Sequence, residues 1–134
     1  MKVMVMVKAT ALSEAGAPPS EATIGAMERF NGELVKAGVL LAAEGLQPSS
    51  TGKRVHFKGP ERTIVDGPFT ETKELVAGFW LWQVKSMEEA VEWLRRCPNP
   101  GPGEWVIEAR PVFETADFRD AATGDAVTAA ARTS

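Results

Sequence analysis

The stretch V-D-G-P-F-T-E-T-K-E-L-V-A-G-F-W-L-W-Q-V-K, from Val65 to Lys85, decides the fold of this chain. Its first half is a turn restricted by glycine and proline, Asp66 to Phe69, followed by the charged segment Glu71 to Glu74. Its second half, Phe79 to Val84, is apolar at consecutive positions and contains two of the four tryptophans. A strand that is apolar on both faces is covered on both sides, so the pattern predicts a central strand of a sheet.

The remaining pattern predicts three more strands, two helices and a hairpin around this strand. Residues 1–9 are apolar on both faces and predict a second central strand. Ser20 is a suitable N-cap and Gly38 a suitable end for a first helix, and Ser86 with Glu89 forms a capping-box pattern that begins a second. In chain order, we expect strand 1–9, helix 20–37, strand 39–46, hairpin strands 54–58 and 62–66, strand 79–84, a helix from residue 86 to Pro98, and strand 104–114.

With the hairpin treated as an insertion, this order is the ferredoxin-like β-α-β-β-α-β unit of an α+β protein. Right-handed crossovers place both helices on one face of the sheet. The opposite face then has no cover, and two tryptophans there would expose more aromatic surface than monomers usually tolerate. We therefore expect a homodimer that packs sheet against sheet. The side chains expected on this interface are Trp80, Trp82, Val84, Met4, Met6 and Val106.

Length and composition predict one folded domain. The chain has 134 residues, and we expect residues 1–114 to form the domain. Residues 115–134 are rich in Ala, Thr and Asp, and we expect a partly ordered or flexible tail. The net charge is −3 and the basic residues are scattered, which argues against direct nucleic-acid binding. The lack of a leader and of a long apolar run predicts a cytoplasmic protein without a membrane segment.

Few residues suggest a metal or a cofactor. The chain has one histidine and one cysteine, so it lacks a clustered ligand set, and it has no glycine-rich phosphate motif. Alternation places His56 with Arg54 and Lys58 on the wet face of the hairpin, which argues against a catalytic role. Cys97 follows a helix C-terminus, where the dipole disfavours a thiolate, so we interpret it as a packing residue. We expect no cofactor and no metal.

Several motifs together resemble those of one known family. They are D-G-P-F at Asp66, E-T-K-E at Glu71, A-G-F-W at Ala77, S-M-E-E-A-V-E-W-L-R-R-C-P at Ser86, A-G-V-L-L-A-A-E-G-L-Q-P-S-S at Ala37 and I-E-A-R-P-V-F-E at Ile107. In this order they resemble the YCII-related proteins, specifically the DGPF-domain branch. The resemblance implies a dimeric α+β barrel built on a ferredoxin-like unit. Some members of the branch are encoded with, or fused to, sigma-factor-like proteins.

The resemblance does not supply a catalytic pair. The broader family includes members with a His–Asp pair, and a few relatives act on small aromatic or lactone-like substrates. The corresponding positions in this chain are Met27 and Cys97, so the pair is absent.

Carboxylates are the remaining candidates for chemistry. Glu44 lies in an apolar strand, and it is either a buried acid or base or a strand-end residue that reaches solvent. Asp66 is the other candidate catalytic carboxylate, although hydrogen bonding to backbone amides in an Asx-type turn is the favoured role. Glu71 and Lys73 either belong to a solvated charged run or bind a ligand at the mouth of a pocket.

Two functional hypotheses follow. The first is a small-ligand-binding domain in which Glu44 and Asp66 are the candidates for cofactor-free acid–base catalysis. The second is a non-catalytic regulatory module that acts through protein contacts, for example with sigma-factor-type regulators. A pocket beside the two carboxylates favours the first hypothesis. A filled core with an exposed apolar patch favours the second.

Overall fold

A four-stranded antiparallel sheet forms the centre of the protein in the computed structural model, which describes residues 1–120. Its strands, in spatial order, are β2 (Leu40–Gly45), β5 (Val76–Gln83), β1 (Lys2–Lys8) and β6 (Ile107–Pro111). Strands β1 and β5 are the two central strands, as their two-sided apolar patterns predict. A long helix, α2, connects β1 to β2, and a second, α3, connects β5 to β6. Together with the strand order, these connections confirm the ferredoxin-like β-α-β-β-α-β unit.

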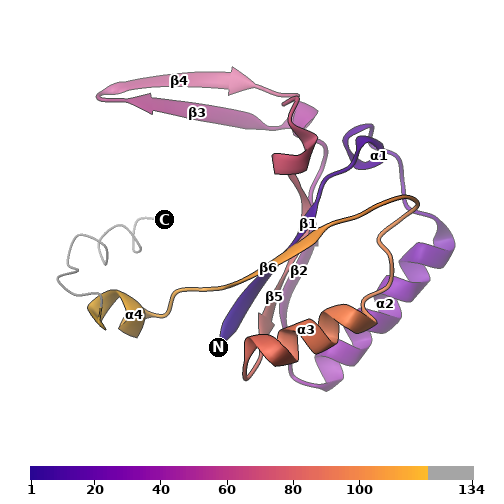
Figure 1. Ribbon diagram of the computed structural model, residues 1–134. Coiled ribbons are helices and arrows are strands. Elements are labelled where there is room, and N and C mark those ends of the chain that lie inside the picture. The colour runs from indigo at the N-terminus through magenta and orange to yellow at the C-terminus, as the bar shows by residue number, and fades with distance from the viewer. Residues whose placement is uncertain (121–134) are drawn as a thin grey trace.

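Two helices cover one face of this sheet (Figure 1). Helix α2 spans Glu21–Lys36, and its N-cap residue Ser20 accepts a hydrogen bond from the Thr23 amide. It ends where Gly38 adopts a positive φ of 73°, a conformation that glycine accommodates without steric cost. Helix α3 spans Met87–Arg96. The ends of both helices agree with the predicted ends to within one or two residues.

The capping of α3 differs in one detail from the expected reciprocal box. The Ser86 hydroxyl accepts a hydrogen bond from the Glu89 amide, as predicted. The Glu89 carboxylate, however, accepts from the Lys85 amide, one residue before the cap. Both bonds satisfy backbone donors at the entry to the helix, so the start of α3 is still defined by this pair of side chains.

The core lies between the sheet and these two helices, and it contains the tryptophans that we expected on the opposite face. Val3 pairs with Trp82, and Val5 pairs with Trp80, so all four side chains point to the same side. Trp82 is fully buried, and Val84 is buried with it. The prediction that Trp80, Trp82 and Val84 share the uncovered face with Met4 and Met6 is therefore wrong.

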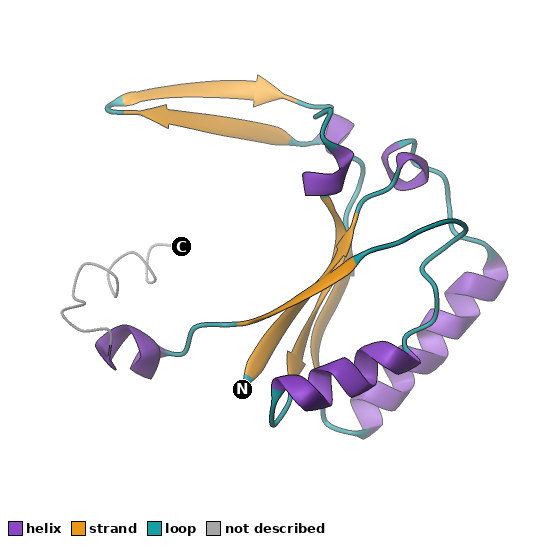
Figure 2. Ribbon diagram, viewed as in Figure 1, coloured by secondary structure: helices purple, strands orange, loops and turns teal. Residues whose placement is uncertain are grey.

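The uncovered face carries the alternate set of side chains. Met4 pairs with Leu81, and Met6 pairs with Phe79 and with Glu108 of β6. These four apolar side chains are half-buried in the single chain. Helices α2 and α3 both lie on the other side of the sheet (Figure 2). The predicted uncovered apolar face therefore exists, but with methionine, phenylalanine and leucine in place of tryptophan. Below we call Met4, Met6, Phe79 and Leu81 the open sheet face.

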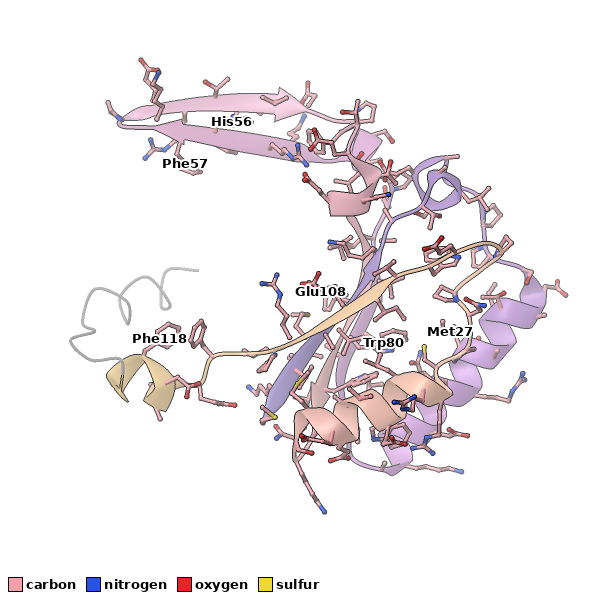
Figure 3. The ribbon with its side chains drawn as sticks, in the orientation of Figure 1. Met27, His56, Phe57, Trp80, Glu108 and Phe118 are labelled. Carbon is pink, nitrogen blue, oxygen red and sulfur yellow. The ribbon has the colours of Figure 1, made fainter. Side chains whose placement is uncertain are left out.

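The inserted hairpin consists of β3 (Lys53–Lys58) and β4 (Glu61–Asp66), which pair only with each other in a separate two-stranded sheet. It projects from the body of the protein (Figure 1). Every residue of both strands is exposed. His56 and Phe57 point to opposite sides of the ribbon (Figure 3), as alternation predicts.

Short elements complete the described chain. They are α1 (Ala11–Glu14), η1 (Ser49–Thr51), η2 (Thr72–Glu74) and α4 (Thr115–Asp120). Helix α1 was not expected, because this region starts a segment rich in turn-forming residues. Thr10 and Ser13 form a capping box around it, each hydroxyl accepting from the other residue's amide. The predicted tail beyond residue 120 lies outside the described residues.

The turn from Asp66 to Phe69 fastens the base of the hairpin to η1. The Gly67 amide donates to the Gly52 carbonyl at 3.0 Å, and the Phe69 amide donates to the Ser49 hydroxyl at 3.0 Å. A Cβ atom at position 67 would lie 1.8 Å from the Ser49 carbonyl oxygen. Only glycine allows this approach of the two backbones.

We expect Gly67→Ala to destabilise the protein by about 3 kcal/mol, because the added methyl group overlaps a backbone atom that has little freedom to move. Chemical denaturation measures this difference. Gly32→Ala is the matched control: a Cβ at position 32 has no atom within 4 Å, and alanine favours the helix by about 1 kcal/mol. Equal stabilities of the Gly67→Ala protein and the unmodified protein would contradict the fastening role of this turn.

Candidate binding cavity

A cavity of about 700 Å³ lies between the helix-covered face of the sheet and the segments that connect the strands to the helices. Met27 and Trp80, which Figure 3 labels, both line it. Its other lining residues are Val7, Leu12, Ser13, Ala17, Pro18, Pro19, Ser20, Asn31, Ala43, Glu44, Gly45, Ala77, Gly78, Phe79, Pro100, Gly101, Pro102 and Trp105. Small-molecule sites in proteins usually measure about 300 to 1,000 Å³, so this cavity has the size of a ligand site.

The absence of side chains at one end of the sheet creates the cavity. Gly45 and Gly78 pair across β2 and β5, and Gly78 also pairs with Val7, whose side chain faces the helices. Both glycines therefore lack a side chain on the helix-covered side. A Cβ at Gly45 would have no atom within 4 Å, so it would project into empty space. At Gly78 a Cβ would lie 3.0 Å from the Glu44 carbonyl oxygen.

One wall of the cavity comes from α1 and the proline-containing segment after it. Leu12 and Ser13 of α1 line the cavity, followed by Pro18 and Pro19. Proline has a fixed φ and no amide donor, so this segment presents a stiff and largely apolar surface. Glu14 holds α1 in place, because its carboxylate accepts hydrogen bonds from both the amide and the hydroxyl of Ser49.

The opposite wall is the loop that joins α3 to β6. Trp105 packs on this loop: its indole Nε1–H donates to the Pro102 carbonyl at 3.2 Å. A Cβ at Gly101 would lie 3.2 Å from the Trp105 ring, so glycine lets the ring lie close to the backbone. The loop sequence P-N-P-G-P-G therefore does more than end the helix, because it positions an aromatic ring at the cavity.

The floor of the cavity contains a polar pair, Trp80 and Asn31. The Trp80 indole Nε1–H donates to the Asn31 Oδ1 at 2.8 Å. Trp80 is buried, while Asn31 is half-buried on the inner side of α2. Asn31 occurs in the stripe Ile24, Met27, Asn31 and Leu34, where the other members are apolar. A polar residue in an apolar stripe is the one sequence signal that could have identified this position.

Glu44 is the only ionisable residue among the lining residues. It pairs with Phe79, whereas its neighbour Ala43 pairs with Trp80 in the core. Alternation therefore directs the Glu44 side chain toward the opposite face of the sheet, and the residue is exposed. Of the two roles open for Glu44, the exposed position agrees with a strand-end residue that reaches solvent.

Asp66 does not line the cavity. Its Oδ1 accepts a hydrogen bond from the Lys53 ammonium at 2.5 Å, across the base of the hairpin. Both side chains are largely exposed, so this ion pair contributes little stability. Among the described residues, the Asp66 carboxylate accepts no hydrogen bond from a backbone amide, so the expected Asx-type turn does not form. The carboxylate binds the Lys53 ammonium, and the Gly67 amide donates to the Gly52 carbonyl.

Glu71 and Lys73 also lie outside the cavity lining, and both are exposed. A hydrogen bond with Glu74, together with the repulsion between the two carboxyl groups, raises the pKa of Glu71. The Arg54 guanidinium opposes this pKa shift. The segment therefore forms a solvated charged surface in the single chain. Glu44 lines the cavity, whereas Glu71 and Lys73 do not.

No group of three or more His, Cys, Asp or Glu side chains in residues 1–120 is arranged to hold a metal ion. No helix in this part of the chain is long and apolar enough to cross a membrane.

These features define an α+β protein with a ferredoxin-like sheet, an inserted hairpin and a largely apolar cavity beneath its helices. The chain belongs to the YCII-related family, since the model of the YCII-related domain matches residues 1–116. It is also similar to an uncharacterized protein of Rhizobium meliloti (strain 1021), with 35% identity over 78 residues. That match covers 58% of this chain and 63% of the relative.

Cys97 lines a smaller depression beside the cavity and is half-buried. Burial raises the pKa of its thiol from 9.0 to about 11. This agrees with a packing role, because a protonated thiol is a poor nucleophile.

We expect alkylation of Cys97 by iodoacetamide to be about a hundredfold slower at pH 8 than that of an unhindered thiol, because the raised pKa lowers the thiolate fraction. The rate should keep rising with pH up to about 11. Mass spectrometry after timed alkylation measures the rate, and the same protein in denaturant is the control. A rate that levels off near pH 8 would contradict this prediction.

Proposed function

We propose that this protein binds a small, mainly apolar molecule in the cavity beneath its helices. The observation that carries the proposal is the combination of size and lining: about 700 Å³, with mostly apolar side chains and a single polar pair on the floor. Ligand sites combine apolar walls with a few placed polar groups in this way. The glycines at one end of the sheet keep the space open at no cost in strain, since neither Gly45 nor Gly78 has a positive φ.

Acid–base catalysis is the finer part of this proposal. Glu44 is the only ionisable residue in the cavity lining, so it is our candidate for the proton transfer. Its support is limited to this position, because alternation directs its side chain toward the opposite face of the sheet. Asp66 has weaker support as its partner, since the Lys53 ion pair occupies Asp66 at the base of the hairpin. Glu71 and Lys73 lie outside the cavity lining, so we propose ligand contact for them only at the charged surface that they form.

A homodimer is the assembly that we propose, with the open sheet face as its interface. Four half-buried apolar side chains lie there without a covering helix. Beside them, Arg110 and Glu108 form an ion pair on β6 with a distance of 2.8 Å. A two-fold axis through this face would place apolar surface against apolar surface in both copies, which is the packing of a dimeric α+β barrel.

A protein-interaction module is the second candidate function, and one observation favours it. Val55, Phe57 and Ile64 are large apolar side chains on one side of the projecting hairpin, and Phe57 is 70% exposed. Exposed apolar patches often mark surfaces that bind other proteins. A protein partner such as a sigma-factor-type regulator would use this surface. The cavity makes ligand binding the preferred proposal, because an interaction module has no need of a concave apolar site of this size.

We expect Gly45→Val to abolish binding in the cavity while leaving the thermal stability unchanged or higher. The valine side chain enters empty space on the cavity side, and β-branched residues suit strands. A ¹⁵N NMR titration with naphthalene, observed at the Trp80 indole N–H, measures binding. Gly32→Ala, on the outer side of α2, should bind like the unmodified protein. Equal binding by the Gly45→Val protein would contradict the assignment of the site.

We expect Leu81→Glu to convert the protein to a monomer without unfolding it. Leu81 lies on the open sheet face, where a carboxylate remains hydrated in the monomer but would be desolvated in the dimer. Sedimentation at micromolar concentration measures the mass. Val91→Glu, on the exposed side of α3, is the control and should stay dimeric. A monomeric unmodified protein, or a dimeric Leu81→Glu protein, would contradict the proposed interface.

A further inference from the structure

The polar pair on the cavity floor has a defined direction. An indole Nε1–H can only donate a hydrogen bond, so the Asn31 group that faces Trp80 must be the carbonyl oxygen. The amide nitrogen, Nδ2, therefore points away from Trp80. Asn31 therefore turns its two Nδ2–H donors away from Trp80, while its Oδ1 is engaged by the indole N–H.

This donor has no partner among the described residues. The single hydrogen bond recorded for the Asn31 side chain is the one from Trp80. The Asn31 Nδ2 is also absent from the fully buried polar atoms without a partner, a set that contains only the Trp82 Nε1 within residues 1–120. The amide nitrogen therefore keeps some exposed surface, and Asn31 lines the cavity. Its two N–H groups are unused by the described residues.

The charge of the lining restricts the ligand further. The lining contains no lysine, arginine or histidine, and its one ionisable residue is a carboxylate. An anion would lose its hydration without gaining a cationic partner, which is costly in an apolar space. The aromatic rings of Trp80 and Trp105 and the side chain of Met27 offer flat apolar surface. Neutral molecules with an apolar body meet these conditions.

We propose that the cavity selects neutral, mainly apolar molecules that carry a hydrogen-bond acceptor, and that the Asn31 Nδ2–H, oriented by Trp80, donates to that acceptor. The inference rests on the proposed function of the same cavity and adds the chemical class of its ligand. At Asn31, molecules that only donate gain no such bond, because their N–H or O–H group would face the Asn31 N–H groups. Asn31 is thus the specificity residue, and Trp80 is the residue that positions it.

Four bicyclic probes of similar size test this selection. Naphthalene has no polar group, quinoline has only an acceptor at pH 7.5, indole has only a donor, and 2-naphthoate is an anion. We expect quinoline to bind about 2- to 10-fold more tightly than naphthalene, the range of one net hydrogen bond. Indole and 2-naphthoate should bind no more tightly than naphthalene.

NMR gives a direct readout of the contact. The chain contains only two asparagines and two glutamines, so the side-chain amide resonance of Asn31 is one of four. Quinoline should shift it, and naphthalene should shift the Trp80 indole N–H with a smaller effect on the amide. Equal affinities for quinoline, naphthalene and indole would overturn the selection while leaving the cavity as a ligand site. Binding of none of the probes would overturn both proposals.

Two variants separate the donor from its orientation. Asn31→Leu removes the donor, so the preference for quinoline over naphthalene should disappear while naphthalene still binds. Trp80→Phe keeps an aromatic floor but removes the indole N–H, which frees the Asn31 amide to turn. Indole should then gain affinity relative to quinoline. An unchanged preference for quinoline in both variants would show that another group makes the contact, and would overturn the assignment to Asn31.

Discussion

The antiparallel register between β1 and β5 is the constraint on which the rest of this structure depends. It places Val3 beside Trp82 and Val5 beside Trp80 on one face of the sheet. Phe30 of α2 then contacts Trp80 edge-on, with a distance of 5.9 Å between the ring centroids. It contacts Trp93 of α3 in the same manner, at 6.3 Å. One phenylalanine thus joins both helices to the central strand through pairs with favourable edge-to-face geometry.

The same register explains why the cavity lies at one end of the sheet. Along β5, the residues on the helix-covered face are Gly78, Trp80 and Trp82. The large rings fill the space between the sheet and the helices at the Trp82 end, where Trp82 is fully buried and its indole Nε1–H has no hydrogen-bond partner among the described residues. At the Gly78 end nothing projects from the strand. The helices are held apart by the tryptophans, and the space beside the glycines remains open.

The fold was predictable from the sequence because its signals are local. Serine caps, a C-terminal glycine and apolar periodicity determine α2 and α3, and two-sided apolar runs identify β1 and β5 as central. The face of each side chain was not predictable, since alternation gives two sets without saying which set lies under the helices. That depends on a pairing between residues nearly eighty positions apart, such as Val3 and Trp82. The four-residue helix α1 is too short to show a period.

The candidate site was harder to predict, because carboxylates are recognisable in a sequence as candidates for chemistry, whereas the space left by a glycine is not. The sequence singled out Glu44 and Asp66 by their chemistry, but only Glu44 reaches the cavity lining. The cavity itself comes from Gly45 and Gly78, whose contribution is the absence of atoms, and from Asn31, a polar residue in an apolar stripe. Each of these acts only through neighbours that the fold supplies.

The turn from Asp66 to Phe69 shows how a motif without chemistry of its own can still affect binding. Its Phe69 amide donates to the Ser49 hydroxyl, and Ser49 in turn donates to the Glu14 carboxylate at the end of α1. Helix α1 forms a wall of the cavity through Leu12 and Ser13. The position of that wall therefore depends on the close approach between Gly67 and the Ser49 carbonyl. A glycine–proline turn at the base of the hairpin, outside the cavity lining, thus sets the position of one cavity wall through three hydrogen-bonded residues.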